Sequence, residues 1–143
     1  MLSDMFDRST LPLLEQVVSF TQARHGVLAG NIANLDTPGY MAKDLSPEAF
    51  QESLKKAIQE QQQAAYYEKY ASASPSPTAP HDGSHPMASV KKDYKSILRH
   101  DGNNAGLEEQ VTEIAKNQQQ HNLALSLMNA QFRLLRAAVT ERA

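Results

Sequence analysis

The sequence contains no cysteine and no tryptophan, and aromatic residues make up only 6% of its 143 residues. The absence of cysteine excludes disulfides and thiolate metal sites, so redox chemistry says nothing about the compartment. The net charge of −2 comes from 14 basic and 16 acidic residues. Nucleic-acid binding and membrane attraction both need clustered positive charge, and we therefore expect neither kind of partner.

Long apolar runs are also missing. No stretch approaches the roughly 20 apolar residues that a membrane-spanning helix needs, so we expect no direct membrane span. The segment from Met1 to Asp7 has neither the basic flank nor the apolar centre of a cleavable secretory signal. We expect a protein that stays in the cytosol or leaves the cell by a route without a cleaved signal peptide.

The first clear pattern is a helix expected over residues 10–35. Thr10 can cap it, and Pro12 suits its first turn, where a missing N–H has no consequence. Pro38 forces the preceding residue into an extended conformation, so Thr37-Pro38-Gly39-Tyr40 ends the helix. The apolar stripe steps alternately by four and three residues, the heptad period, through Leu14, Val18, Thr21, His25, Leu28, Ile32 and Leu35.

A stronger heptad pattern covers residues 105–143. Eight of its ten seam positions are apolar, and a helix of this length extends for roughly 50 Å. A helix with one narrow apolar seam needs a partner helix, and the first helix is the nearest one available. We call these ten positions the C-terminal seam: Leu107, Val111, Ile114, Gln118, His121, Leu125, Met128, Phe132, Leu135 and Val139.

The predicted fold class is all-α. We expect the N- and C-terminal heptad helices to pair as an antiparallel coiled coil, with a short middle helix and a Pro-rich irregular excursion between them. Ser46-Pro47 is a capping residue followed by a first-turn proline, which predicts the start of the middle helix. Residues 71–88 hold four of the seven prolines and form the excursion. Residues 89–99 fit either a weak strand or a short helix.

No group of residues suggests catalysis, a metal or a cofactor. His81 and His85 lie between prolines, so no helix can hold both imidazoles on one side. His25 and His121 both fall on heptad positions. They could meet across the paired helices or face a neighbouring subunit, and we interpret them as polar residues that control the register. An enzyme using His100 and Asp101 would need a partner group and a pocket that nothing in the sequence indicates. We predict a protein that is not an enzyme and has no cofactor.

The most specific segment is Ala23 to Asp44, which resembles the N-terminal signature of the flagellar rod and hook family. In that signature an Arg is followed by Leu-Ala-x-Asn-Ile-Ala-Asn and then by Thr-Pro-Gly-Tyr. The matching positions are Arg24, Leu28, Ala29, Asn31, Ile32, Ala33, Asn34, Thr37, Pro38, Gly39, Tyr40 and Asp44. The short chain and Asp101-Gly102-Asn103 resemble the proximal rod subunit nearest the membrane ring.

The signature also has a physical reading. Asn31 and Asn34 fall in the last turn of the first helix, where their amides can bond to free carbonyls or bind a neighbouring subunit. Ala29, Gly30 and Ala33 are small, so another backbone can approach closely. We therefore interpret the signature and the C-terminal seam as subunit-packing residues.

The resemblance implies a structural rod subunit in the periplasm, within the flagellar basal body. It implies export by the flagellar type III apparatus and packing against copies of itself, other rod subunits, and MS-ring and rod-adaptor proteins. Residues 1–45 and 100–143 would form the helical rod-core domain. Residues 46–99 would hold the middle helix, the Pro/Ser-rich loop and the connector. The alternative is a cytosolic coiled-coil adaptor or export chaperone, which would share the heptads without needing the signature.

Overall fold

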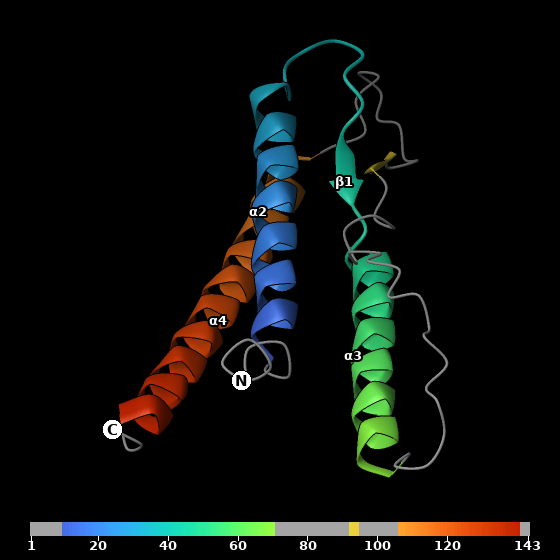
Figure 1. The fold of residues 1–143 in the computed structure, drawn as a ribbon. Coiled ribbons are helices and arrows are strands. Elements are labelled where there is room, and N and C mark those ends of the chain that lie inside the picture. Colours follow the sequence, from blue (N-terminus) through green and yellow to red (C-terminus); the bar gives the residue numbers. More distant parts are fainter. Residues whose placement is uncertain (1–9, 71–91, 95–105, 141–143) are drawn as a thin grey trace.

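A computed structural model describes residues 10–70, 92–94 and 106–140 (Figure 1). The predicted irregular excursion at 71–88 lies outside these residues. So do His81, His85, His100 and Asp101.

Helix α2 spans Leu11–Ala33, close to the prediction. Leu14 N donates to Thr10 O at 3.0 Å, which makes Thr10 the boundary residue, although its side chain forms no capping hydrogen bond. After the helix, Tyr40 N donates to Thr37 O at 3.1 Å, and Gly39 has a φ of 73°. Pro38 followed by a glycine with positive φ is the arrangement of a type II turn, and this turn reverses the chain.

The reversed chain forms a short strand and then the middle helix. Strand β1 spans Lys43–Leu45 and pairs antiparallel with β2, Lys92–Tyr94, so that Asp44 lies opposite Asp93. Helix α3 spans Pro47–Tyr70. Ser46 caps it as predicted, since Ala49 N donates to Ser46 Oγ at 3.2 Å. Figure 1 shows β1 running back along α2 before the chain enters α3.

Helix α4 spans Leu107–Thr140 and packs against α2 in the opposite direction. Asn31, near the end of α2, contacts Gln110 near the start of α4, whereas Thr21 contacts His121 farther along α4. In Figure 1 the two helices lie side by side at the start of α4, which diverges from α2 toward its C-terminal end. The antiparallel arrangement of the end helices was predicted, but their pairing through coiled-coil heptads stays a prediction.

A small apolar core lies between α2, β1 and the first turns of α3. It consists of Phe20, Leu45 and Phe50, all nearly inaccessible to solvent. The rings of Phe20 and Phe50 stack with their centroids 4.1 Å apart. These contacts attach α3 to α2 on the side away from α4. The described part of the chain is therefore mostly helical, as expected, with one added two-stranded ribbon.

The face that α4 turns toward α2 differs from the predicted one. Glu113 is half-buried at one edge of the contact with α2. The other buried and half-buried positions on α4 follow a heptad through Gln110, Ile114, Asn117, His121, Ala124, Met128, Gln131 and Leu135, which we call the inner face. It shares only four residues with the C-terminal seam: Ile114, His121, Met128 and Leu135. The other six seam residues, Leu107, Val111, Gln118, Leu125, Phe132 and Val139, are exposed in the single chain. Their burial in an assembly stays a prediction.

Two further points concern the helices. His25 is exposed and does not meet His121, so the suggested histidine contact within the chain is wrong. Among the described residues, no helix combines the length and apolar character that crossing a membrane requires.

Candidate functional site

The signature residues of α2 meet β1 and α4 in a connected polar cluster centred on Arg24. Arg24 is 3% exposed. Its Nε donates to Asp44 Oδ1 at 2.9 Å, and its Nη2 donates to Asp44 Oδ2 at 2.7 Å and to Glu113 Oε2 at 2.8 Å. One guanidinium thus holds a carboxylate of β1 in a bidentate pair and a carboxylate of α4 at the same time.

The charges of this cluster are balanced within the chain. Lys116 Nζ contacts Glu113 Oε1 at 2.9 Å, so Glu113 lies between two cations. The hydrogen bond from Lys116, with that of Arg24 and the charges of both, lowers the pKa of Glu113 although partial burial opposes this shift. Burial also opposes the charged form of Arg24, but the hydrogen bonds and charges of Asp44 and Glu113 raise the pKa of Arg24 overall. Arg24 and Glu113 are therefore both charged at neutral pH.

Asn31 forms a second junction between the same three segments. It is 1% exposed, and its Nδ2 donates to Lys43 O at 2.7 Å and to Gln110 Oε1 at 3.0 Å. Its Oδ1 accepts hydrogen bonds from Lys43 N at 3.1 Å and from the Tyr40 hydroxyl at 3.2 Å. Both amide protons and both acceptor positions of Asn31 are thus used inside the chain.

Asn34 closes the end of α2. Its Nδ2 donates to Gly30 O at 2.8 Å, and its backbone N–H donates to the same carbonyl at 3.2 Å. The side chain therefore satisfies a last-turn carbonyl, which is one of the two roles considered for it.

Farther along the pair of helices, Thr21 joins α2 to α4. Asn117 Nδ2 donates to Thr21 O at 2.8 Å, and Thr21 Oγ1 lies 2.9 Å from His121 Nδ1. Asn117 Oδ1 and Gln110 Nε2 are buried without a hydrogen-bond partner. Polar side chains make many of the contacts between α2 and α4. These contacts therefore mainly fix how the two helices are aligned, and they bury little apolar surface.

The remaining signature residues divide into two groups. Leu28 is completely buried, and Ile32 is half-buried. Five signature residues are exposed: Ala29, Ala33, Thr37, Pro38 and Gly39. The buried polar members of the signature therefore hold the chain's own fold together, and only the exposed ones stay available for the predicted subunit packing.

Sequence reasoning missed the α4 partners of the signature, namely Gln110, Glu113 and Asn117. The available signal was a mainly polar repeat, since Gln110, Asn117 and Gln131 recur on a seven-residue period whose fourth position is Ala124. An apolar pattern draws attention first because buried surface is usually apolar. Here the inner face, which mixes polar and apolar residues, packs against α2, and six of the ten residues of the C-terminal seam are exposed.

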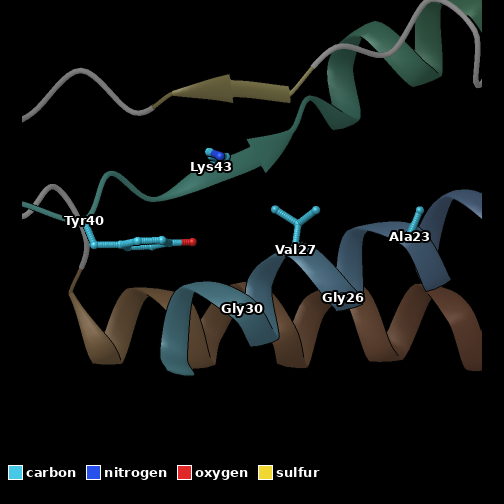
Figure 2. Close-up of a pocket in the computed structure, with 6 residues that line it drawn as sticks. All are labelled: Ala23, Gly26, Val27, Gly30, Tyr40 and Lys43. Carbon is cyan, nitrogen blue, oxygen red and sulfur yellow. The ribbon is translucent and has the colours of Figure 1, made fainter. Parts of the chain in front are cut away.

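A shallow cavity of about 360 Å³ lies between α2 and the segment leading into β1 (Figure 2). It is lined by Ala23, Gly26, Val27, Gly30, Tyr40 and Lys43. The lining holds no pair of groups that could serve as nucleophile and base. Within the described ranges, no cluster of three or more histidine or acidic side chains could hold a metal ion.

The most extensive unusual surface is on α4. Nine large hydrophobic residues of the described chain are exposed, and eight of them are on this helix: Leu107, Val111, Leu123, Leu125, Leu127, Phe132, Leu134 and Val139. Eight large exposed hydrophobic residues on one helix are more than scattered surface residues would give, which makes α4 the candidate interaction surface of the described chain.

Comparison with known proteins agrees with the signature. No protein-family model matches the chain. The chain is 28% identical over 125 residues to the flagellar basal body rod protein FlgB of Escherichia coli, covering 87% of this chain and 88% of that protein. It is 29% identical over 131 residues to FlgB of Bacillus subtilis, covering 92% and 93%. A match to FlgB of Aquifex aeolicus is 52% identical over 33 residues, covering 23% and 27%. The chain is thus similar over about nine tenths of its length to flagellar basal body rod proteins named FlgB, in agreement with its signature from Arg24 to Asp44.

Proposed function

We propose that the chain is a structural subunit of the flagellar basal-body rod that polymerises through its terminal helices. Two things support this: the named relatives are rod proteins, and α4 exposes apolar surface that its own chain leaves uncovered. In this role the protein connects the membrane ring to the distal rod, transmits torque and lines the export channel. It is a structural protein without an active site, as its relatives are.

The exposed surface of α4 is the observation that carries the proposal. The inner face holds α4 against α2 through specific polar contacts, which leaves large apolar side chains for neighbouring subunits. Those neighbours are copies of the chain and other rod subunits, with MS-ring and rod-adaptor proteins at the membrane end. Burial of this surface on assembly supplies the stabilisation that a single chain lacks.

The proposed route to this place is the flagellar type III apparatus, without a cleaved signal peptide, and the proposed site is the periplasmic part of the basal body. We assign the rod-core domain to residues 1–45 and 100–143, and the remaining segment to 46–99. The packing of α4 on α2, which joins the two ends of the chain, supports this division.

The test replaces the natural chain in its own cells and measures swimming and the amount of protein in purified basal bodies. The double variant Leu125→Asp with Phe132→Asp places charge on the exposed apolar surface, and we expect it to be absent from basal bodies. The matched control, Asn122→Asp with Asn129→Asp, adds charge at exposed polar positions with the same spacing and should assemble normally. If the unchanged chain is found in the cytosol and not in basal bodies, the adaptor or chaperone alternative is correct instead.

A further inference from the structure

The side of α4 that contacts α2 repeats itself every seven residues. Seven residues are almost two full turns of an α-helix, so a shift of α4 by seven residues presents nearly the same side to α2. Such a shift moves α4 by roughly 10 Å along its axis. The inner face consists of two series with this spacing: Gln110, Asn117, Ala124 and Gln131, and Ile114, His121, Met128 and Leu135.

The packing of the inner face distinguishes poorly between the natural alignment and the two shifted ones. In one shifted alignment Met128 takes the place of His121, and in the other Ile114 does so. Cores tolerate exchanges between side chains of similar volume. Gln110 can also take the place of Asn117, because both side chains are amides. Another contact must therefore select the natural alignment.

The buried amides of the inner face are incompletely bonded. Gln110 Oε1 accepts a hydrogen bond from Asn31 Nδ2 at 3.0 Å, yet Gln110 Nε2 is buried without a partner. Asn117 Nδ2 donates to Thr21 O at 2.8 Å, yet Asn117 Oδ1 is buried without a partner. Each amide thus leaves one of its two polar atoms unbonded. The amides alone set the alignment only in part, because a shift would not break a fully satisfied network.

The ion pair between Arg24 and Glu113 differs from these contacts, because it can form in one alignment alone. Nη2 of the buried Arg24 donates to Glu113 Oε2 at 2.8 Å. The residues seven positions before and after Glu113 are Gly106 and Gln120, so neither shifted alignment brings a carboxylate to this place. Arg24 would keep Asp44 but lose its charged acceptor on α4. Hydrogen bonds of charged groups are the stronger ones, so this loss is costly.

We propose that Glu113, through its bond to Arg24, selects one of three alignments of α4 that differ by seven residues. Glu113 acts as a positioning residue, in the way that a single polar pair sets the register of two paired helices. The selected alignment determines where the exposed apolar residues of α4 lie along α2. The inference concerns the fold of one chain and does not depend on the proposed function.

The test moves the carboxylate by seven residues and asks whether α4 follows. The double variant Glu113→Gln with Gln120→Glu keeps the net charge, and the carboxylate introduced by Gln120→Glu reaches Arg24 only if α4 shifts. Because the sequence contains no cysteine, an introduced pair of cysteines reports the alignment in the dilute full-length chain. The readout is the disulfide that forms within the chain on mild oxidation, measured by peptide mass spectrometry.

The reporter pair is Thr21→Cys with Ala124→Cys. Thr21 lies against Asn117 in the natural alignment, one seven-residue step from Ala124. This step is roughly 10 Å, and a disulfide needs Cα atoms within about 7 Å, so the pair closes only after the shift. Moving the carboxylate should raise the disulfide yield about tenfold or more over the natural background, the change expected from one charged hydrogen bond.

The matched control is Glu113→Gln with Gln119→Glu. It has the same composition, but its carboxylate is introduced about 100° around the helix from position 120. The control should not raise the disulfide yield above that of Glu113→Gln alone. Equal yields from the two moved carboxylates, or no increase over the natural background, would overturn the proposal.

A second measurement leaves the contact between the helices unchanged. Spin labels on Ser19→Cys and Asn129→Cys, both at exposed positions, report the separation of α2 and α4 by electron paramagnetic resonance. Moving the carboxylate from position 113 to position 120 should shift the two labels relative to each other by roughly 10 Å along the helices. An unchanged distance between the labels would show that Glu113 does not select the alignment.

Discussion

Arg24 connects three segments that are distant in sequence. Its guanidinium is buried and bonds to Asp44 of β1 and Glu113 of α4. The planar fork of arginine can serve two carboxylates in fixed geometry, which the single ammonium of lysine cannot do. The side chain thus determines how the turn after α2 and the start of α4 are positioned on α2.

Replacing Arg24 with glutamine should destabilise the isolated chain by about 3 kcal/mol. The change removes the cation and leaves two partly buried carboxylates facing each other. Urea denaturation followed by circular dichroism measures the effect. The control is Lys116→Gln, which removes an exposed partner of Glu113 and should change stability by less than about 0.5 kcal/mol. Equal effects of the two substitutions would contradict the central role of Arg24.

Acid should weaken the same cluster. Because the folded-state pKa of Glu113 is below its unfolded value, its contribution is complete above the ordinary glutamate pKa of about 4.3. It is then lost as the pH falls through the lower folded-state pKa. Urea midpoints measured from neutral pH into this acid range should fall more for the natural chain than for Glu113→Gln. Parallel curves for the two proteins would exclude Glu113 as a source of the acid sensitivity.

At the scale of the elements, a glycine in the turn after α2 and a glycine inside α2 differ in whether another residue could replace them. Gly39 has a φ of 73°, which side chains other than glycine rarely adopt. Gly26 is inside α2, and a Cβ added there would meet nothing within 4 Å. The turn therefore needs its glycine for backbone geometry, whereas the described chain gives no such reason for Gly26.

Gly39→Ala should cost about 1 kcal/mol, and Gly26→Ala should stabilise the isolated chain by about 0.5–1 kcal/mol. Thermal melts of the two variants measured side by side provide the comparison. Destabilisation by Gly26→Ala in the isolated chain would show that α2 is packed at this position.

One side of helix α4 contacts α2, whereas its other sides are exposed to solvent. Gln110 and Asn117 of its inner face, with Glu113 beside them, fix the register on α2. Its other sides expose leucine, valine and phenylalanine. A helix that is apolar in several directions is normally surrounded by partners, and the chain itself supplies only one of them along the described part of α4.

At the scale of the whole molecule, we expect substitutions of different residues to affect the stability of the isolated chain and its assembly. Leu28→Ala removes a fully buried side chain and should cost the isolated chain about 2–5 kcal/mol. Phe132 is 48% exposed, so Phe132→Ala should change the stability of the isolated chain by no more than about 0.5 kcal/mol. Its effect should appear as loss from basal bodies and loss of swimming. A large loss of stability in isolated Phe132→Ala would place this ring in the chain's own core.

The sequence alone determined the helices and the family resemblance, but not the strand β1 at Lys43–Leu45. Helix starts and stops depend on local chemistry, which explains why Pro12, Ser46 and the turn at Thr37 to Tyr40 predicted the boundaries of α2 and α3 closely. The signature could be identified from the sequence because its residues lie in one continuous segment of the chain.

Only the tertiary structure decided what those residues contact. Whether Asn31 binds a neighbour or its own chain depends on segments 12 and 79 residues away in sequence. The heptad period likewise could not identify the side of α4 that meets α2, because apolar and polar repeats of seven run in parallel. The hydrogen bonds of Gln110 and Asn117 to α2 place their side of α4 against α2 and leave six residues of the C-terminal seam exposed.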